Sequence, residues 1–206
     1  MEENKNHDIK IILLGEERVG KTSLINAFMD KQFNPKEDYT LEKSVFSKEI
    51  QINNKILSVE IWDTMGQEKF RSVTKSLIKD SNLVIFVYDI TRRETFLELN
   101  FWHNIAIEEL ENEEVIFGVA ANKIDLFSDS EVETTEAEIY SEEKIKGLFY
   151  ETSAKENPLG FKKFVNLLLE KLIEKPKFLE KVKYKSNGNI KLELNNNKIN
   201  KKKSCC

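Results

Sequence analysis

Eight consecutive residues near the start of the chain have the types and spacing of a phosphate-binding loop. The segment Gly15–Thr22 reads GEERVGKT, which matches G-x-x-x-x-G-K-[ST], and lies between an apolar run and a helical pattern. Its two glycines permit a tight turn, so backbone N–H groups and a helix N-terminus can surround a phosphate. Lys21 can reach the terminal phosphates and the Thr22 hydroxyl can ligate Mg²⁺. This motif predicts a nucleotide site but does not choose between ATP and GTP.

A second motif indicates which base the bound nucleotide carries. Asn122, Lys123 and Asp125 form an N-K-x-D segment directly after an apolar run. The two carboxylate oxygens of Asp125 can accept the N1 and N2 donors of guanine, which adenine does not offer in that arrangement. A buried carboxylate facing the wrong base would be left unpaired, so the preference for guanine should be large. Ala154, in a later E-T-S-A-K segment, can donate its N–H to guanine O6.

The elements around these motifs alternate between strands and helices. Strands are predicted from short apolar runs at 10–14, 45–51, 56–62, 83–88, 115–121 and 148–151. Helices are predicted at 21–29, 73–79, 95–110, 135–146 and onward from Pro158. This order predicts an α/β fold of the P-loop GTPase type, with a doubly wound, six-stranded, mostly parallel sheet, helices on both faces and one antiparallel edge pair.

Composition divides the chain into a domain and a tail. We expect an N-terminal extension at 1–7, a nucleotide-binding domain at 8–175 and a flexible tail at 176–206, which is rich in Lys and Asn. The net charge of −4 argues against a nucleic-acid partner. We see neither an apolar run long enough to span a membrane nor a signal peptide. Both cysteines, Cys205 and Cys206, are the last two residues, where neither a disulfide nor a metal site explains them.

With the motifs in this order, residues 8–175 resemble the Ras superfamily of small GTPases and are most similar to its Rab family. The Rab-like segments are Ile61–Thr64, Phe86–Thr91 and Ser204–Cys206. The resemblance implies that Gln67 orients the attacking water, with Lys21 as the second catalytic residue. It implies nucleotide contacts and metal ligands as well. The nucleotide-binding residues would be Gly15, Glu17, Arg18, Val19, Gly20, Lys21, Thr22, Ser23, Phe33, Thr40, Gly66, Asn122, Lys123, Asp125, Ser153, Ala154 and Lys155. The Mg²⁺ ligands would be Thr22, Thr40 and Asp63.

The same resemblance implies a switch on a membrane. An exchange factor, an activating protein, a prenyl-carrier or GDP-dissociation inhibitor, and effectors would bind the switch regions. Prenyl groups on Cys205 and Cys206 would give the stable anchoring that one lipid cannot, and Lys201–Lys203 would attract anionic headgroups. The location would be the cytoplasmic face of a vesicle or organelle membrane, with cycling to the cytosol, and the process would be vesicle-mediated transport.

The chain departs from the family's pattern inside the phosphate loop. Glu17 and Arg18 stand where small residues are usual, and Met65 and Glu42 replace smaller residues in the switch regions. A carboxylate at position 17 would crowd Gln67 and repel phosphate oxygens. We therefore expect GTP to bind and to be hydrolysed slowly. Two alternatives stay open: a GTP-bound recruitment module with little or no hydrolysis, and a P-loop kinase or ATPase, which Asp125 disfavours.

Overall fold

The structure, a computed structural model, describes residues 8–35, 44–52, 55–64, 71–110, 114–176, 178 and 185–186. The strands are β1 (Ile9–Leu14), β2 (Ser44–Ile52), β3 (Lys55–Asp63), β4 (Leu83–Asp89), β5 (Ile116–Asn122), β6 (Leu148–Thr152) and β7 (Lys185–Ser186). The α-helices are α1 (Lys21–Phe28), α2 (Arg71–Ile78), α3 (Arg93–Leu97), α4 (Leu99–Glu109), α5 (Thr134–Tyr140) and α6 (Pro158–Ile173). A 3₁₀ helix, η2 (Ile124–Asp129), and a π-helical turn, η3 (Ser141–Ile145), complete the elements.

The predicted six-stranded sheet is confirmed. Its strands lie in the order β2-β3-β1-β4-β5-β6, and β2 is antiparallel to β3 while the other neighbours are parallel. The tail adds a short segment that we did not expect, because the two residues of β7 pair antiparallel with Lys55 and Ile56 at the start of β3. All five parallel strands therefore end at one edge of the sheet, where the predicted nucleotide motifs follow them.

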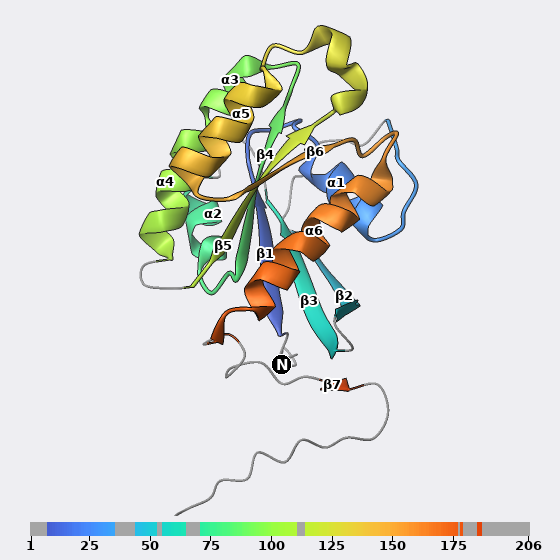
Figure 1. Cartoon of the computed structure of the whole chain (residues 1–206), viewed down its shortest axis with the longest axis vertical. Helices are drawn as coiled ribbons and strands as arrows, with labels where there is room; N and C mark the ends of the chain where they lie inside the picture. The colour runs from blue at the N-terminus through green and yellow to red at the C-terminus, as the bar shows by residue number, and fades with distance from the viewer. Residues whose placement is uncertain are drawn as a thin grey trace, which may run out of the picture.

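Helices cover both faces of the sheet, as predicted (Figure 1). On one face, α1 and α6 pack their apolar residues against β1, β3 and β4, around Phe161, Phe164 and Leu168. On the other face lie α2, α3, α4 and α5, with Phe86, Trp102 and other side chains at the centre. Every residue of β4 is buried, as expected of a strand covered on both sides.

Two predicted helices differ from the structure. The segment predicted as one helix at 95–110 is divided at Glu98 into α3 and α4. The segment predicted at 135–146 begins as α5 and ends as the π-helical turn η3, which Lys146 terminates with a left-handed φ of 56°. Apolar spacing does not reveal this π-helical turn, because five residues are too few for the wider i→i+5 turn to change the apolar pattern.

The start of α6 follows from its sequence. Pro158 occupies the first turn, where a missing N–H costs nothing, and the Asn157 side chain accepts a hydrogen bond from the Gly160 N–H at 3.0 Å. His103 is buried edge-on against Phe86 and Phe117. Within the described ranges, no helix is both long and apolar enough to cross a membrane.

Candidate nucleotide-binding site

The phosphate-binding loop connects β1 to α1 and depends on its two glycines. Gly15 has a φ of 148°, and a Cβ there would lie 2.1 Å from the Val87 carbonyl oxygen. Gly20 has a φ of 95°, and its Cβ would lie 2.4 Å from Nδ2 of Asn122. A side chain at either position would collide with the neighbouring strand, so the loop needs both glycines to approach the ends of β4 and β5.

Lys21 lies buried inside this loop. Its ammonium donates to the carbonyl oxygens of Gly15, at 2.9 Å, and Glu16, at 2.8 Å. Burial lowers the pKa of Lys21 to about 8, although Asp63, Glu16 and Glu17 act in the opposite direction. The loop therefore holds a cation whose charge is only partly balanced, and an anionic phosphate would stabilise it.

The residues predicted to hold Mg²⁺ are partly brought together. Thr22 Oγ1 donates to Asp63 Oδ2 at 2.7 Å, which joins the start of α1 to the end of β3. A hydroxyl and a carboxylate at the mouth of a phosphate loop are the oxygen donors that Mg²⁺ prefers, so this pair fits the ion. The adjacent Thr64 hydroxyl donates to the Leu13 carbonyl at 2.6 Å, which fixes the end of β3 against β1.

The predicted base-binding residues also converge. Asp125, in η2, accepts a hydrogen bond from Ser153 Oγ at 2.6 Å, and Lys155 Nζ lies 3.9 Å from its other oxygen. Asn122 donates to the Val19 carbonyl at 2.8 Å and accepts from Thr152 at 3.2 Å. Residues from β5, η2 and the loop after β6 thus meet beside the phosphate loop, as the guanine interpretation requires.

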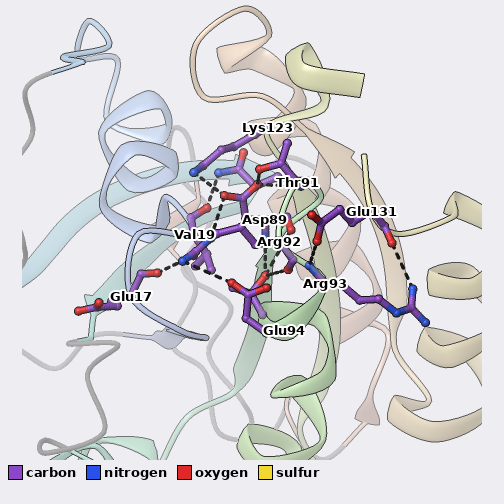
Figure 2. Close-up of polar contacts among 11 residues, drawn as sticks. Glu17, Val19, Asp89, Thr91, Arg92, Arg93, Glu94, Lys123 and Glu131 are labelled. Carbon is purple, nitrogen blue, oxygen red and sulfur yellow. Dashed lines mark hydrogen bonds and ion pairs between the residues drawn. The ribbon is translucent and has the colours of Figure 1, made fainter. Parts of the chain in front are cut away.

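Lys123 is held by a carboxylate that the sequence analysis did not select. Its backbone is left-handed, with a φ of 69°, and its ammonium lies 2.6 Å from Oδ2 of Asp89 at the end of β4. Burial alone would raise the pKa of Asp89, but hydrogen bonds from Lys123 and Thr91 outweigh it and hold this pKa below its ordinary value. Asp89 therefore stays ionised near neutral pH. Figure 2 shows its contacts with Lys123 and Thr91.

Three side chains from distant parts of the chain donate hydrogen bonds to the phosphate loop, and the sequence pattern had indicated only one of these residues, Asn122. Trp102 Nε1 donates to the Glu16 carboxylate at 3.1 Å, and Arg92 Nη2 donates to the Glu17 carbonyl at 2.8 Å. Asn122 supplies the third, to Val19. Asp89 could have been flagged from its position, because the carboxyl ends of parallel strands meet at the ligand site. No local signal indicates Arg92 or Trp102.

Of the remaining predicted site residues, some lie among the described residues and others lie outside them. Phe33 is 41% exposed in the segment after α1. Glu17 is half-buried, and Arg18 is exposed with a left-handed φ of 62°. Ser23 lies in the first turn of α1, and Ala154 is buried beside the base residues. Outside the described residues lie Thr40, Glu42, Met65, Gly66, Gln67, Cys205 and Cys206.

Fold and site together define a P-loop nucleotide-binding protein with a guanine-type base motif. The sequence model of the Ras family matches residues 10–174. The chain is 38% identical to the Ras-related protein Rab-2B of Dictyostelium discoideum over 84% of its length and 86% of that protein. It is also similar to two human Ras-related proteins. Identity to Rab-21 is 37%, over 86% of this chain and 77% of that protein, and identity to Rab-30 is 40%, over 77% of each. The chain belongs to the Ras family and is a Rab-like small GTPase.

Proposed function

We propose that this protein binds GTP and GDP with Mg²⁺, hydrolyses GTP, and acts as a membrane-anchored switch in vesicle-mediated transport. The observation that carries the proposal is that the phosphate loop and Asp125 meet at one edge of the sheet, joined by the Asn122–Val19 hydrogen bond of 2.8 Å. One set of residues can therefore hold the phosphates while the other selects the base. Family membership supports the same activity.

We assign a role to the described residues of the candidate site. Lys21 faces the β- and γ-phosphates, and Thr22 with Asp63 would hold the ion, which neutralises phosphate charge when bound. Asp125 accepts the N1 and N2 donors of guanine, and Ser153 keeps the carboxylate oriented at 2.6 Å. Because the Lys123 ammonium pairs with Asp89, the aliphatic part of its side chain can cover one face of the base. Phe33, exposed after α1, can cover the other face.

Hydrolysis would depend on Gln67 to orient the attacking water, with Thr40 and Gly66 sensing the γ-phosphate. These three assignments come from the family resemblance. Glu17 is the residue that we expect to slow this step, by crowding Gln67 and repelling phosphate oxygens. Single-turnover GTP hydrolysis should therefore be faster in Glu17→Gly than in the unaltered protein. Equal rates would overturn the crowding argument while leaving nucleotide binding intact.

Binding itself has a direct test. The protein should retain GDP and GTP and reject ADP and ATP by at least about a hundredfold, because adenine leaves Asp125 unpaired. A competition assay with a fluorescent guanine nucleotide measures this ratio. Preferential binding of ATP would contradict the proposal and favour a P-loop kinase or ATPase.

The membrane part of the proposal rests on the tail. Prenylation of Cys205 and Cys206 would anchor the protein to the cytoplasmic face of a vesicle or organelle membrane, and a prenyl-carrier or GDP-dissociation inhibitor would return it to the cytosol. Exchange factors, activating proteins and effectors would bind the nucleotide-dependent loops. Imaging of a fluorescently tagged protein, with and without Cys205→Ser and Cys206→Ser, tests anchoring and compartment together. A membrane signal that survives both substitutions would overturn the lipid anchor.

A second candidate is a GTP-bound recruitment module with little or no hydrolysis. The half-buried Glu17 in the phosphate loop favours it. The two candidates differ in one measurement, because a switch has a measurable kcat in the presence of an activating protein whereas the module does not.

A further inference from the structure

Arg92 bridges the two halves of the nucleotide site. Its guanidinium donates through Nη2 to the Glu17 carbonyl at 2.8 Å and through Nε to Asp89 Oδ2 at 3.3 Å. Glu17 is part of the phosphate loop, whereas the same Asp89 oxygen also accepts the ammonium of Lys123 at 2.6 Å. Figure 2 shows the side chain of Arg92 between Asp89 and Glu17. One chain of contacts therefore runs from the phosphate loop to the base-binding lysine.

The surroundings hold Arg92 in this position. Its N–H donates to the Asp89 carbonyl at 3.0 Å, and its own carbonyl accepts from Thr95 Oγ1 at 2.7 Å. The other oxygen of Asp89 is occupied by the N–H and hydroxyl of Thr91, at 3.0 and 2.8 Å. Because Asp89 is buried and Thr91 holds its Oδ1, its Oδ2 is fixed between the cations of Arg92 and Lys123. Fixed partners of this kind lose little side-chain entropy when they form hydrogen bonds.

We propose that Arg92 is a positioning residue that couples the phosphate loop to Lys123 through Asp89 and thereby slows release of the bound guanine nucleotide. The inference rests on the proposed function. Release requires the phosphate loop or the base residues to move away from the ligand. With Arg92 in place, a shift of the Glu17 carbonyl disturbs the carboxylate that orients Lys123, so the two halves open together instead of one at a time.

The neighbouring Arg93 provides a matched control. It directly follows Arg92 as the first residue of α3, but its guanidinium pairs with Glu136 of α5 at 2.6 and 2.9 Å and its side chain is 44% exposed. In Figure 2 it points away from Glu17, beyond Glu131. Arg93→Ala therefore removes the same charge and a comparable ion pair without touching the phosphate loop.

The experiment measures the dissociation rate of a fluorescent GDP analogue from the full chain. Arg92→Ala should release the nucleotide about tenfold faster, the size expected for loss of charge-assisted hydrogen bonds, and Arg93→Ala should stay within about twofold of the unaltered protein. Arg92→Lys, whose single ammonium cannot serve both partners, should fall between the two. If Arg92→Ala does not fold, the intermediate rate of Arg92→Lys carries the test, and an unchanged rate overturns the proposal.

A double-mutant cycle separates positioning from general stabilisation. Lys123→Met keeps the aliphatic stem over the base but removes the contact with Asp89. In that background, Arg92→Ala should accelerate release by a clearly smaller factor than in the unaltered protein. If Arg92→Ala accelerated release by the same factor in both backgrounds, the proposed coupling would be overturned. Failure of the unaltered protein to bind GDP would instead refute the proposed function, so the two failures are distinguishable.

Discussion

The phosphate end and the base end of the site are built in different ways. At the phosphate end, the loop is held by donors from distant elements. Arg92 before α3 and Asn122 of β5 donate to its backbone carbonyls, and Trp102 of α4 donates to the Glu16 carboxylate. At the base end, Asp125 is held by two side chains of one neighbouring loop, Ser153 and Lys155. The phosphate end is thus joined to several elements, whereas Asp125 at the base end is held by the side chains of one loop.

This difference reflects what each end must recognise. A phosphate is bound by backbone N–H groups, so the path of the loop must be fixed before the ligand arrives. Guanine is read by a carboxylate, and a carboxylate needs only the correct orientation. Changes at the phosphate end should therefore affect folding and binding together, while changes at the base end should affect binding alone.

Gly15→Ala is expected to give the largest effect and tests this contrast most directly. The added Cβ would lie 2.1 Å from the Val87 carbonyl oxygen at a φ that side chains rarely adopt. We expect a loss of about 2–4 kcal/mol in the free energy of unfolding, together with loss of GDP binding. Urea denaturation of the ligand-free protein measures the first effect. Gly160→Ala, where the Cβ would meet only the Asn157 side-chain amide, is the control and should cost less.

Asp125→Asn should separate binding from stability at the base end. The substitution leaves an oxygen for Ser153 but replaces one acceptor for guanine with a donor. GDP affinity should fall about a hundredfold or more, while the free energy of unfolding changes by less than about 1 kcal/mol. Calorimetry and urea denaturation give the two values. Asp129→Asn, at an exposed position of the same 3₁₀ helix, should change neither. A large loss of stability in Asp125→Asn would contradict the proposed difference between the two ends of the site.

The pKa of Lys21 predicts how pH affects the phosphate end. Its folded-state pKa of about 8 lies below the ordinary 10.5, so the charged amine needed for phosphate binding is lost as pH rises through 8. GDP affinity should fall about fivefold between pH 8 and pH 9, because the charged fraction of a group with a pKa of about 8 falls from about one half to about one eleventh. The free energy of unfolding of the ligand-free protein should change in the opposite direction and increase with pH. The charged buried amine is unfavourable below pH 8, and that penalty disappears as pH rises toward 10.5. Lys21→Arg, which stays charged, should show no such fall in affinity; a persisting fall would assign the effect to another group.

Trp102→Phe should give the smallest of the four effects. It removes the indole N–H that donates to the Glu16 carboxylate while keeping an aromatic ring in the core. We expect a loss of about 1–2 kcal/mol in the free energy of unfolding and faster GDP release. Trp62→Phe is the matched control, since its indole donates to Glu60 two residues away on the same strand. Equal effects on GDP release would show that α4 does not support the phosphate loop.

Local pattern was sufficient for most of the fold, and it selected the candidate site residues, whose roles stay predictions. The buried strands β1, β4 and β5 and the amphipathic helix α6 follow from apolar spacing, which depends only on neighbouring residues. The phosphate loop and Asp125 follow from motifs a few residues long. The break at Glu98 and the π-helical turn η3 were missed, because backbone pairing at these points does not alter the apolar pattern. Gln67, Thr40, Cys205 and Cys206 remain predictions.

The sequence by itself determined the order of the main strands and helices and predicted the phosphate loop and the guanine preference, because each is encoded in a short stretch of chain with its own geometry. Tertiary structure alone decided which distant side chains support that loop. Arg92 lies 75 residues from Glu17, and Trp102 lies 86 residues from Glu16. They become neighbours only because the sheet places β4 beside β1 and packs α4 against it. Which distant side chains contact the loop depends on the assembled sheet, and the pattern of neighbouring residues does not specify it.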